Sequence, residues 1–130
     1  LLSVPRDTVF RYPHFPKGEV VDLNIIVLAG VLAAEPEVRE FASGTTLVRC
    51  LVTVRSVTPR KRVDVIPVVL WNPRPDVELP EQRGDRVWVV GTVQRRFWAK
   101  DADRRSRIEV VAHEIRRRSD AGSEQERRTA

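Results

Sequence analysis

Five short runs of apolar and β-branched residues, each followed by turn-forming residues, constrain the fold more than any other feature of the chain. The runs span residues 24–32, 45–56, 63–71, 86–98 and 106–115. Runs of this length that are rich in valine, isoleucine and threonine and bounded by Gly, Pro, Asn or Asp are typical of β-strands. The sequence therefore predicts an all-β domain of five strands.

The turn residues between these runs narrow the architecture further. Residues 72–85 contain Pro73, Pro75 and Pro80, so at most one short helical turn fits between the third and fourth strands, with Gly84 closing it. Pro67 removes a hydrogen-bond donor from the third strand, which favours an edge or a bulge there. Five strands with one short helical turn predict the oligonucleotide/oligosaccharide-binding fold (OB-fold), a small barrel that binds ligands across its second and third strands.

The predicted barrel domain covers residues 24–118 of the 130-residue chain. Residues 1–23 form an N-terminal extension, and we expect its aromatic residues to pack on the barrel or on a subunit joint. Residues 119–130 have no apolar residue beyond alanine, which predicts a disordered C-terminal tail.

Positive charge is concentrated in the last quarter of the predicted domain. Residues 94–118 hold nine Arg and Lys against four Asp and Glu, an excess equal to the whole net charge of +5. A clustered basic stripe suits a polyanion such as nucleic acid, although a merely solvated surface is the alternative.

Other features bear on the compartment. No run approaches the roughly 18 apolar residues of a membrane span, and the first residues do not resemble a signal peptide. Cys50 is the single cysteine, so an internal disulfide is excluded, and we expect it to be a small buried residue. These observations predict a cytoplasmic protein that does not associate with membranes.

Residues that could carry catalysis or bind a cofactor are scarce. His14 and His113 have no partner at metal-ligand spacing, and no phosphate-binding glycine loop or Gly-x-Ser-x-Gly motif occurs. Asp101 and Asp103 lie in a predicted hairpin turn, where Asp is a common turn former. We therefore expect neither an enzyme nor a bound metal or cofactor.

The fourth strand carries the most informative stretch, "QRRFWAK" at residues 94–100. Because strand side chains alternate between faces, Gln94, Arg96 and Trp98 share one face and Phe97 lies on the other. An exposed indole beside a guanidinium can stack on a nucleobase while the cation contacts phosphate. We assign nucleic-acid contact to Trp98, Arg96 and Gln94, and packing to Phe97.

The third strand offers a second ring. Val65, Pro67, Val69 and Trp71 share a face, so Trp71 is a second stacking candidate. Core packing or a subunit contact is the alternative for Trp71, and burial is the alternative for Trp98. Trp88, inside the apolar stretch "VWVV", is more typical of a core or interface residue.

Basic residues outside this strand are expected to contribute phosphate contacts. Arg60, Lys61 and Arg62 lie on the loop between the second and third strands, where OB-fold barrels bind their ligands. Arg39, Arg49 and Arg55 are further candidates.

Several stretches together resemble bacterial single-stranded DNA-binding proteins over residues 24–118. "NIIVLAGVLAAEPEVREFASGTTLVRCLVTV" is similar to the first half of that family, and "VDVIPVVLWN" is similar to its third strand. "RGDRVWVVGTVQRRFW" and "RIEVVAHEI" resemble its last two strands. The resemblance implies DNA contacts at Trp71, Arg96 and Trp98, and also at Arg39 and Arg83.

The chain departs from this family at places that bear on function. Val65 stands where members usually carry a stacking aromatic residue, and the loop between the second and third strands lacks an aromatic residue. Many members end in an acidic, Phe-terminated tip that recruits proteins, whereas this sequence ends "EQERRTA", so we do not expect that recruitment.

These observations predict sequence-independent binding of single-stranded DNA in replication, repair or recombination, by a divergent paralogue. The resemblance implies a homo-oligomer, with a tetramer preferred over a dimer, and the first strand is a candidate pairing edge. One alternative is an OB-fold assembly module that has largely lost nucleic-acid binding. Another is RNA binding, because stacking does not distinguish the 2′-hydroxyl.

Overall fold

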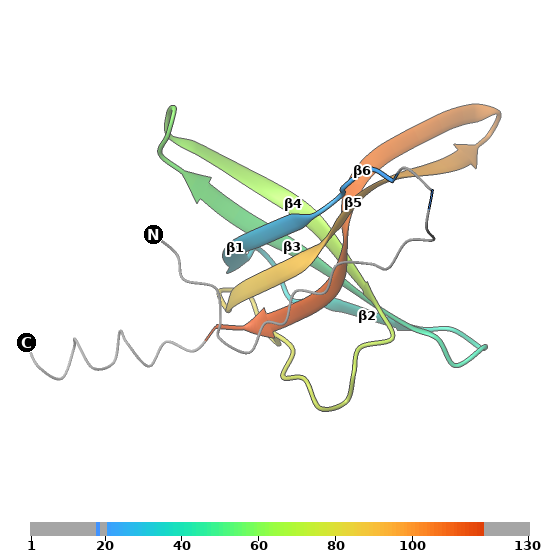
Figure 1. The fold of residues 1–130 in the computed structure, drawn as a ribbon. Coiled ribbons are helices and arrows are strands. Elements are labelled where there is room, and N and C mark those ends of the chain that lie inside the picture. The colour runs from blue at the N-terminus through green and yellow to red at the C-terminus, as the bar shows by residue number, and fades with distance from the viewer. Residues whose placement is uncertain (1–17, 19–20, 119–130) are drawn as a thin grey trace, which may run out of the picture.

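The computed structural model describes residue 18 and residues 21–118 and consists of six β-strands (Figure 1). The strands are β1 (Ile26–Leu32), β2 (Glu37–Glu40), β3 (Thr46–Ser56), β4 (Arg62–Trp71), β5 (Arg86–Lys100) and β6 (Asp103–Arg117). Five of them match the predicted runs. The short β2 was not predicted, because its four exposed residues, Glu-Val-Arg-Glu, carry no apolar pattern.

The strands form one sheet in the order β1-β5-β6-β4-β3-β2, and β1 also pairs with β3, which closes a ring. Neighbouring strands are antiparallel except β4 and β6, which pair in parallel at Val68 and Val69. At the closing point a Cβ on Gly30 would lie 2.3 Å from the Thr53 carbonyl oxygen, so only glycine fits between β1 and β3. The predicted all-β OB-fold barrel is confirmed.

The barrel core comes from alternate residues that point inward from every long strand. It consists of Leu32, Val48, Cys50, Val52, Val68, Leu70, Val87, Val89, Val110, Ala112 and Ile115. Burial raises the pKa of the Cys50 thiol to about 11, so the thiol stays protonated at neutral pH. Cys50 is a buried core residue, as predicted, and Trp88 is also buried, with 7% of its surface exposed.

The loop over residues 72–85 differs from the prediction. It contains turns and bends but no helical turn, since its three prolines interrupt any run of backbone donors. The Asp85 carboxylate organises its end by accepting hydrogen bonds from the backbone N–H groups of Glu81 and Gln82, at 3.0 and 3.2 Å.

Strands β5 and β6 continue past the barrel as a two-stranded hairpin, visible at the upper right of Figure 1. Their pairing extends to Lys100 and Asp103, and the turn consists of Asp101 and Ala102, both with positive φ. The hairpin is therefore longer, and its turn shorter, than predicted. A register shift at Val90/Gly91 marks a bulge within the barrel, since Ala112 and Val110, which lie between it and the projecting hairpin, are core residues.

The assignment of Phe97 to packing was wrong. Its side chain is 71% exposed, because the projecting hairpin has only two strands and no layer lies against its Phe97 face in the described structure. The predicted extension and tail fall largely or wholly outside the described residues. Among those described, no helix is long and apolar enough to span a membrane, and no group of three or more His, Cys, Asp or Glu could hold a metal ion.

Candidate nucleic-acid interface

The strand registers place Trp71 and Trp98 on the same face of the sheet. Val69 pairs with Val111 on β6, and Val111 pairs with Thr92 on β5, so these three side chains lie on one face. Trp71 is two residues beyond Val69, and Trp98 is six residues beyond Thr92. Alternation keeps both indoles on that face, opposite to the core. We call this surface the tryptophan face.

Trp98 is 39% exposed and has cations around it. Gln94 and Arg96 share its face on β5, as predicted from alternation. On β6, Arg105 lies opposite Trp98, and Arg107 lies opposite Arg96. The Arg107 guanidinium carbon is 5.7 Å from the centroid of the Trp98 ring, within range of a cation–π contact.

Glu109 forms an ion pair with Arg107. Its Oε2 atom is 3.5 Å from an Arg107 guanidinium nitrogen, and the residue is only 6% exposed. Oε2 accepts no hydrogen bond within the described residues, so the ion pair is its only compensation for burial. Glu109, Arg107 and Trp98 therefore form a connected row on the tryptophan face.

Trp71 lies at the end of β4 and is 44% exposed. Its ring stacks on Phe41, with the centroids 6.0 Å apart and the planes inclined by 26°. The Arg39 guanidinium carbon lies 5.2 Å from the Phe41 ring centroid. Two aromatic rings and a cation thus gather here, and Arg39, a predicted DNA-contact residue, lies over the ring that stacks on Trp71.

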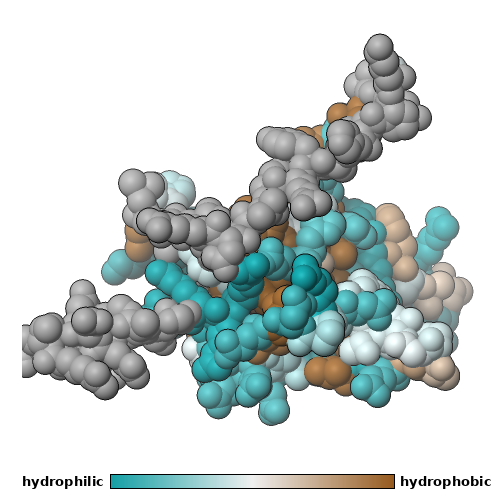
Figure 2. All heavy atoms as spheres, turned by 60° about the horizontal axis from the view of Figure 1, so that its bottom comes forward, coloured by the Kyte–Doolittle hydropathy of each residue, from teal (hydrophilic) through white to brown (hydrophobic). Residues whose placement is uncertain are grey.

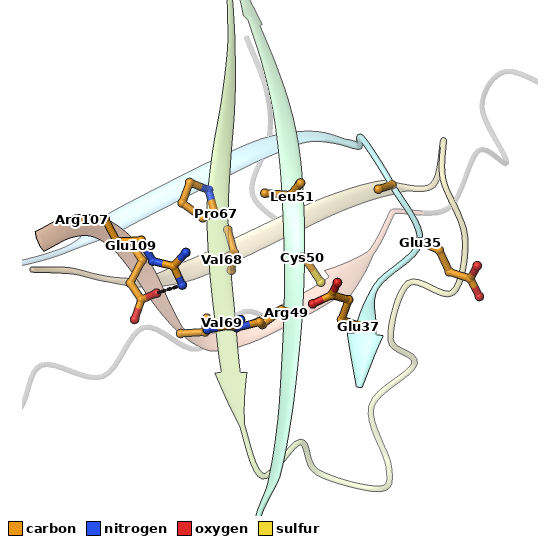
Figure 3. A pocket seen from close by; sticks show the side chains of 11 residues that line it. Glu35, Glu37, Arg49, Cys50, Leu51, Pro67, Val68, Val69, Arg107 and Glu109 are labelled. Atoms are coloured by element: carbon orange, nitrogen blue, oxygen red, sulfur yellow. Dashed lines mark ion pairs between the residues drawn. The ribbon is translucent and has the colours of Figure 1, made fainter. Parts of the chain in front are cut away.

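A hollow of about 200 Å³ opens on the tryptophan face over β3 and β4 (Figure 3). Leu51 and Pro67 form its apolar floor, and Arg49 lies beside Val69. Figure 3 shows Arg107 and Glu109 on one side of these strands and Glu35 and Glu37 on the other. The buried Arg49 Nε donates no hydrogen bond within the described residues, so a hydrogen-bond acceptor entering the hollow would satisfy it.

Not every predicted residue belongs to this surface. Arg60 and Lys61 lie on the β3–β4 loop, at the opposite end of β4 from Trp71, and Arg62 is paired with Asp64 at 2.9 Å. The ten residues of β4 span about 30 Å at the usual strand rise. Arg83 lies in the loop before β5, where it lines a separate groove with Arg55, Arg86 and Arg118.

Sequence reasoning missed four residues of the tryptophan face: Phe41, Arg105, Arg107 and Glu109. Phe41 follows the unpredicted strand β2, so nothing in the local pattern linked it to Trp71. The other three lie on β6, and a hairpin register with its turn at Asp101 and Ala102 would have identified them.

The five long strands, closed into a small barrel by the pairing of β1 with β3, place the protein in the class of OB-fold proteins. The model of the single-strand binding protein family matches residues 23–118, and the chain belongs to that family. A search among curated proteins found no significant match.

Two solved structures share the fold. The chain is similar to the single-stranded DNA-binding protein from Thermus aquaticus, with a TM-score of 0.65 and 23% identity over 77% of this chain and 52% of that one. It is also similar to the Plasmodium falciparum SSB in complex with ssDNA, with a TM-score of 0.64 and 18% identity over 78% of this chain and 99% of that one. The chain thus spans about half the length of the Thermus protein.

Proposed function

We propose that the protein binds single-stranded DNA with little sequence preference, in replication, repair or recombination, and that it acts without catalysis. The observation that carries this proposal is the pair of exposed indoles, Trp71 and Trp98, on one sheet face. Arg107 lies over the Trp98 ring, and Arg39 lies over the Phe41 ring that stacks on Trp71. Family membership and the fold shared with an SSB bound to ssDNA support it.

The chemistry of the face suits unpaired nucleotides. An exposed ring stacks on any base, because every base has a π-face, and each stack contributes about 1–3 kcal/mol. Arg96, Arg105 and Arg107 lie on the same face as Trp98 and would neutralise phosphates along the strand. A duplex hides its bases in the stack, so exposed rings favour single strands over double strands.

The decisive experiment is a titration of tryptophan emission with oligo-dT at two salt concentrations. We expect quenching, with an affinity that falls with salt by about 0.7 log units per log unit of salt for each phosphate neutralised. Trp98→Ala should remove most of the quenching, while Trp88→Phe, a change at a buried ring, should leave the affinity within about twofold.

The same titration separates the alternatives. Unchanged emission at micromolar protein and low salt would favour an OB-fold assembly module without nucleic-acid binding. Tighter binding of oligo-U than of oligo-dT would favour RNA as the ligand, because stacking alone does not read the 2′-hydroxyl and cannot produce such a preference.

We further propose a homo-oligomer, with a tetramer preferred over a dimer, that pairs through β1. This strand pairs with β5 from Ile26 to Val31 but with β3 only at Val31 and Leu32. Among the described residues its remaining edge is unpaired, and such edges pair readily with a second strand. Light scattering gives the mass directly, and Val27→Pro, which removes a backbone donor from β1, should shift the mass toward the monomer.

A further inference from the structure

The hollow of Figure 3 lies between the two exposed tryptophans of the tryptophan face. Pro67, in its floor, is four residues before Trp71 on β4. Glu109, at its side, is four residues beyond Arg105, and Arg105 pairs with Trp98. Four residues correspond to about 13 Å along a strand. A polynucleotide that stacks on both indoles would therefore pass over the hollow, and the residues that line the hollow decide which part of the polynucleotide can enter it.

The charges around the hollow disfavour a phosphate group. Three carboxylates and two guanidinium groups line it, those of Glu35, Glu37, Glu109, Arg49 and Arg107. One of the two cations, Arg107, is already paired with Glu109. A phosphate that entered the hollow would therefore meet an excess of like charge. A nucleobase is flat and neutral, and it would find an apolar surface on Leu51 and Pro67. The base is thus the part of the strand that fits the hollow.

Two buried polar atoms of the residues that line the hollow have no hydrogen-bond partner within the described chain, and they are of opposite kinds. Arg49 Nε is a donor, and Glu109 Oε2 is an acceptor. Arg49 pairs with Val69, and its side chain extends over β4 toward Glu109 (Figure 3). A group that brings an acceptor to Arg49 and a donor to Glu109 would satisfy both atoms. The edge of a nucleobase carries both kinds of group side by side.

We propose that the hollow binds one base of the DNA strand and selects bases with an exocyclic amino group, namely cytosine, adenine and guanine, over thymine. The amino group donates to Glu109, and a ring nitrogen or carbonyl oxygen accepts from Arg49. Thymine presents one N–H between two carbonyl oxygens, which the Glu109 carboxylate repels. The proposal rests on the proposed function and adds a preference at one position of the strand, while the bases stacked on Trp71 and Trp98 stay unselected.

The test compares the binding of oligo-dC and oligo-dU of equal length, measured by the quenching of tryptophan emission. Cytosine and uracil share one ring size, but cytosine carries an amino group where uracil carries a carbonyl oxygen. The wild-type protein should bind oligo-dC about tenfold more tightly, as expected for one hydrogen bond to a charged group. In Glu109→Gln the amide donates as well as accepts, so the ratio of the two affinities should fall to within about twofold. Binding of oligo-dU should tighten in this variant, which a misfolded protein would not show.

Glu81→Gln is the matched control, because it changes the net charge by the same amount. Glu81 lies in the loop over residues 72–85 and does not line the hollow. Figure 2 brings forward the end of the barrel that carries this loop, and hydrophilic side chains gather over it. The ratio of the affinities for oligo-dC and oligo-dU should stay at the wild-type value in Glu81→Gln.

Arg49→Met tests whether Arg49 contacts a base or a phosphate. Methionine keeps an unbranched stem but has no N–H donor. The variant should bind oligo-dC and oligo-dU about threefold more weakly, with an unchanged log–log salt slope, because a contact to a neutral base releases no counterion. A slope that is shallower by about 0.7 would mean that Arg49 contacts a phosphate, which overturns the proposal.

Failure of this proposal and failure of the proposed function give different results. Quenching of the wild-type protein by oligo-dC and oligo-dU with equal affinity overturns the preference but leaves the tryptophan face in place. A preference for oligo-dC that persists in Glu109→Gln also overturns it, because the hollow is then not the source of the preference. Absence of quenching with either oligonucleotide and with oligo-dT overturns the proposed function itself.

Discussion

The Arg107 guanidinium lies 5.7 Å from the Trp98 ring centroid, and a buried glutamate holds the same guanidinium at 3.5 Å. The cation therefore lies over one face of the indole and is fixed there by a charge on its own strand. A base that stacks on the other face of Trp98 would find a positive charge already in place for its phosphate. This arrangement ties folding and binding to the same side chain.

Arg107→Ala should destabilise the protein, because it leaves the Glu109 carboxylate buried without its partner. We expect the free energy of unfolding to fall by about 1–3 kcal/mol, less than for a fully buried pair, since Arg107 is 42% exposed. Adding Glu109→Gln should restore most of the loss, which urea denaturation of the two single variants and the double variant measures.

Arg105→Ala provides the control for this cycle. Arg105 lies opposite Trp98 and forms no ion pair within the described residues. Its removal therefore changes the net charge by the same amount as Arg107→Ala but leaves no carboxylate without a partner. Equal destabilisation by both substitutions would show that the buried carboxylate does not depend on Arg107.

Val65→Trp should strengthen DNA binding. Val65 is 52% exposed on the same face of β4 as Trp71, and an indole there would add a stacking surface worth about 1–3 kcal/mol. The measurement is the affinity for oligo-dT at fixed salt. Val38→Trp is the control, because Val38 is exposed on β2 but its side chain points to the opposite face from that of its neighbour Arg39. A similar gain in affinity from Val38→Trp would mean that the position of the ring does not matter.

Ala102→Gly should stabilise the β5–β6 hairpin. Ala102 has a φ of 70°, a left-handed conformation that costs an L-residue about 1–2 kcal/mol and glycine almost nothing. After the entropy that glycine gains in the unfolded chain, a gain of about 0.5–1 kcal/mol should remain. Amide hydrogen exchange across the hairpin would report it as slower exchange.

Ala99→Gly tests the reason for that effect. Ala99 lies on β5 outside the turn and has no positive φ, so glycine should cost about 0.5–1 kcal/mol and accelerate exchange. If both glycine variants behave alike, backbone strain at Ala102 is not the cause.

Asp85 should make the protein sensitive to acid. Hydrogen bonds from the backbone N–H groups of Glu81 and Gln82, together with the charge of Arg117, lower the pKa of the Asp85 carboxyl despite its partial burial. A lowered folded-state pKa stabilises the fold fully above the ordinary value of about 3.9, and this stabilisation is lost as the pH falls through the folded value. Asp85→Asn should lower the thermal midpoint at pH 7 and narrow the difference between pH 7 and pH 3.

Much of the fold follows from local sequence patterns. The five β-branched runs and the glycine and proline positions were sufficient for the barrel, because each long strand alternates between core and surface residues or is largely apolar. Strand β2 escaped prediction, since Glu37–Glu40 pairs with β3 through backbone bonds and buries no side chain. The helical turn predicted in residues 72–85 is absent, because the spacing of the prolines allows one short helical turn but does not require it.

The candidate site was predictable only along single strands. Alternation alone grouped Gln94, Arg96 and Trp98, and the register of β5 confirms that they share a face. Contacts between strands depend on register, which the sequence does not state, so the Glu109–Arg107–Trp98 row and the Phe41–Trp71 stack were not foreseen. For the same reason Arg60, Lys61 and Arg83 were grouped with residues from which the fold separates them.

In the projecting hairpin, the number of β5 residues that precede Phe97 and Trp98 decides which side each ring faces. Phe97 and Trp98 point to opposite sides of the hairpin. The side that each ring takes depends on the number of residues between it and Gly91, which pairs with Ile26 in the barrel. Removing one residue between Gly91 and Phe97 would exchange the rings, leaving a phenyl group beside Arg107 and the indole on the reverse side. Removing two residues would shorten the arm but keep each ring on its own side, so this segment should tolerate changes in length only by even numbers.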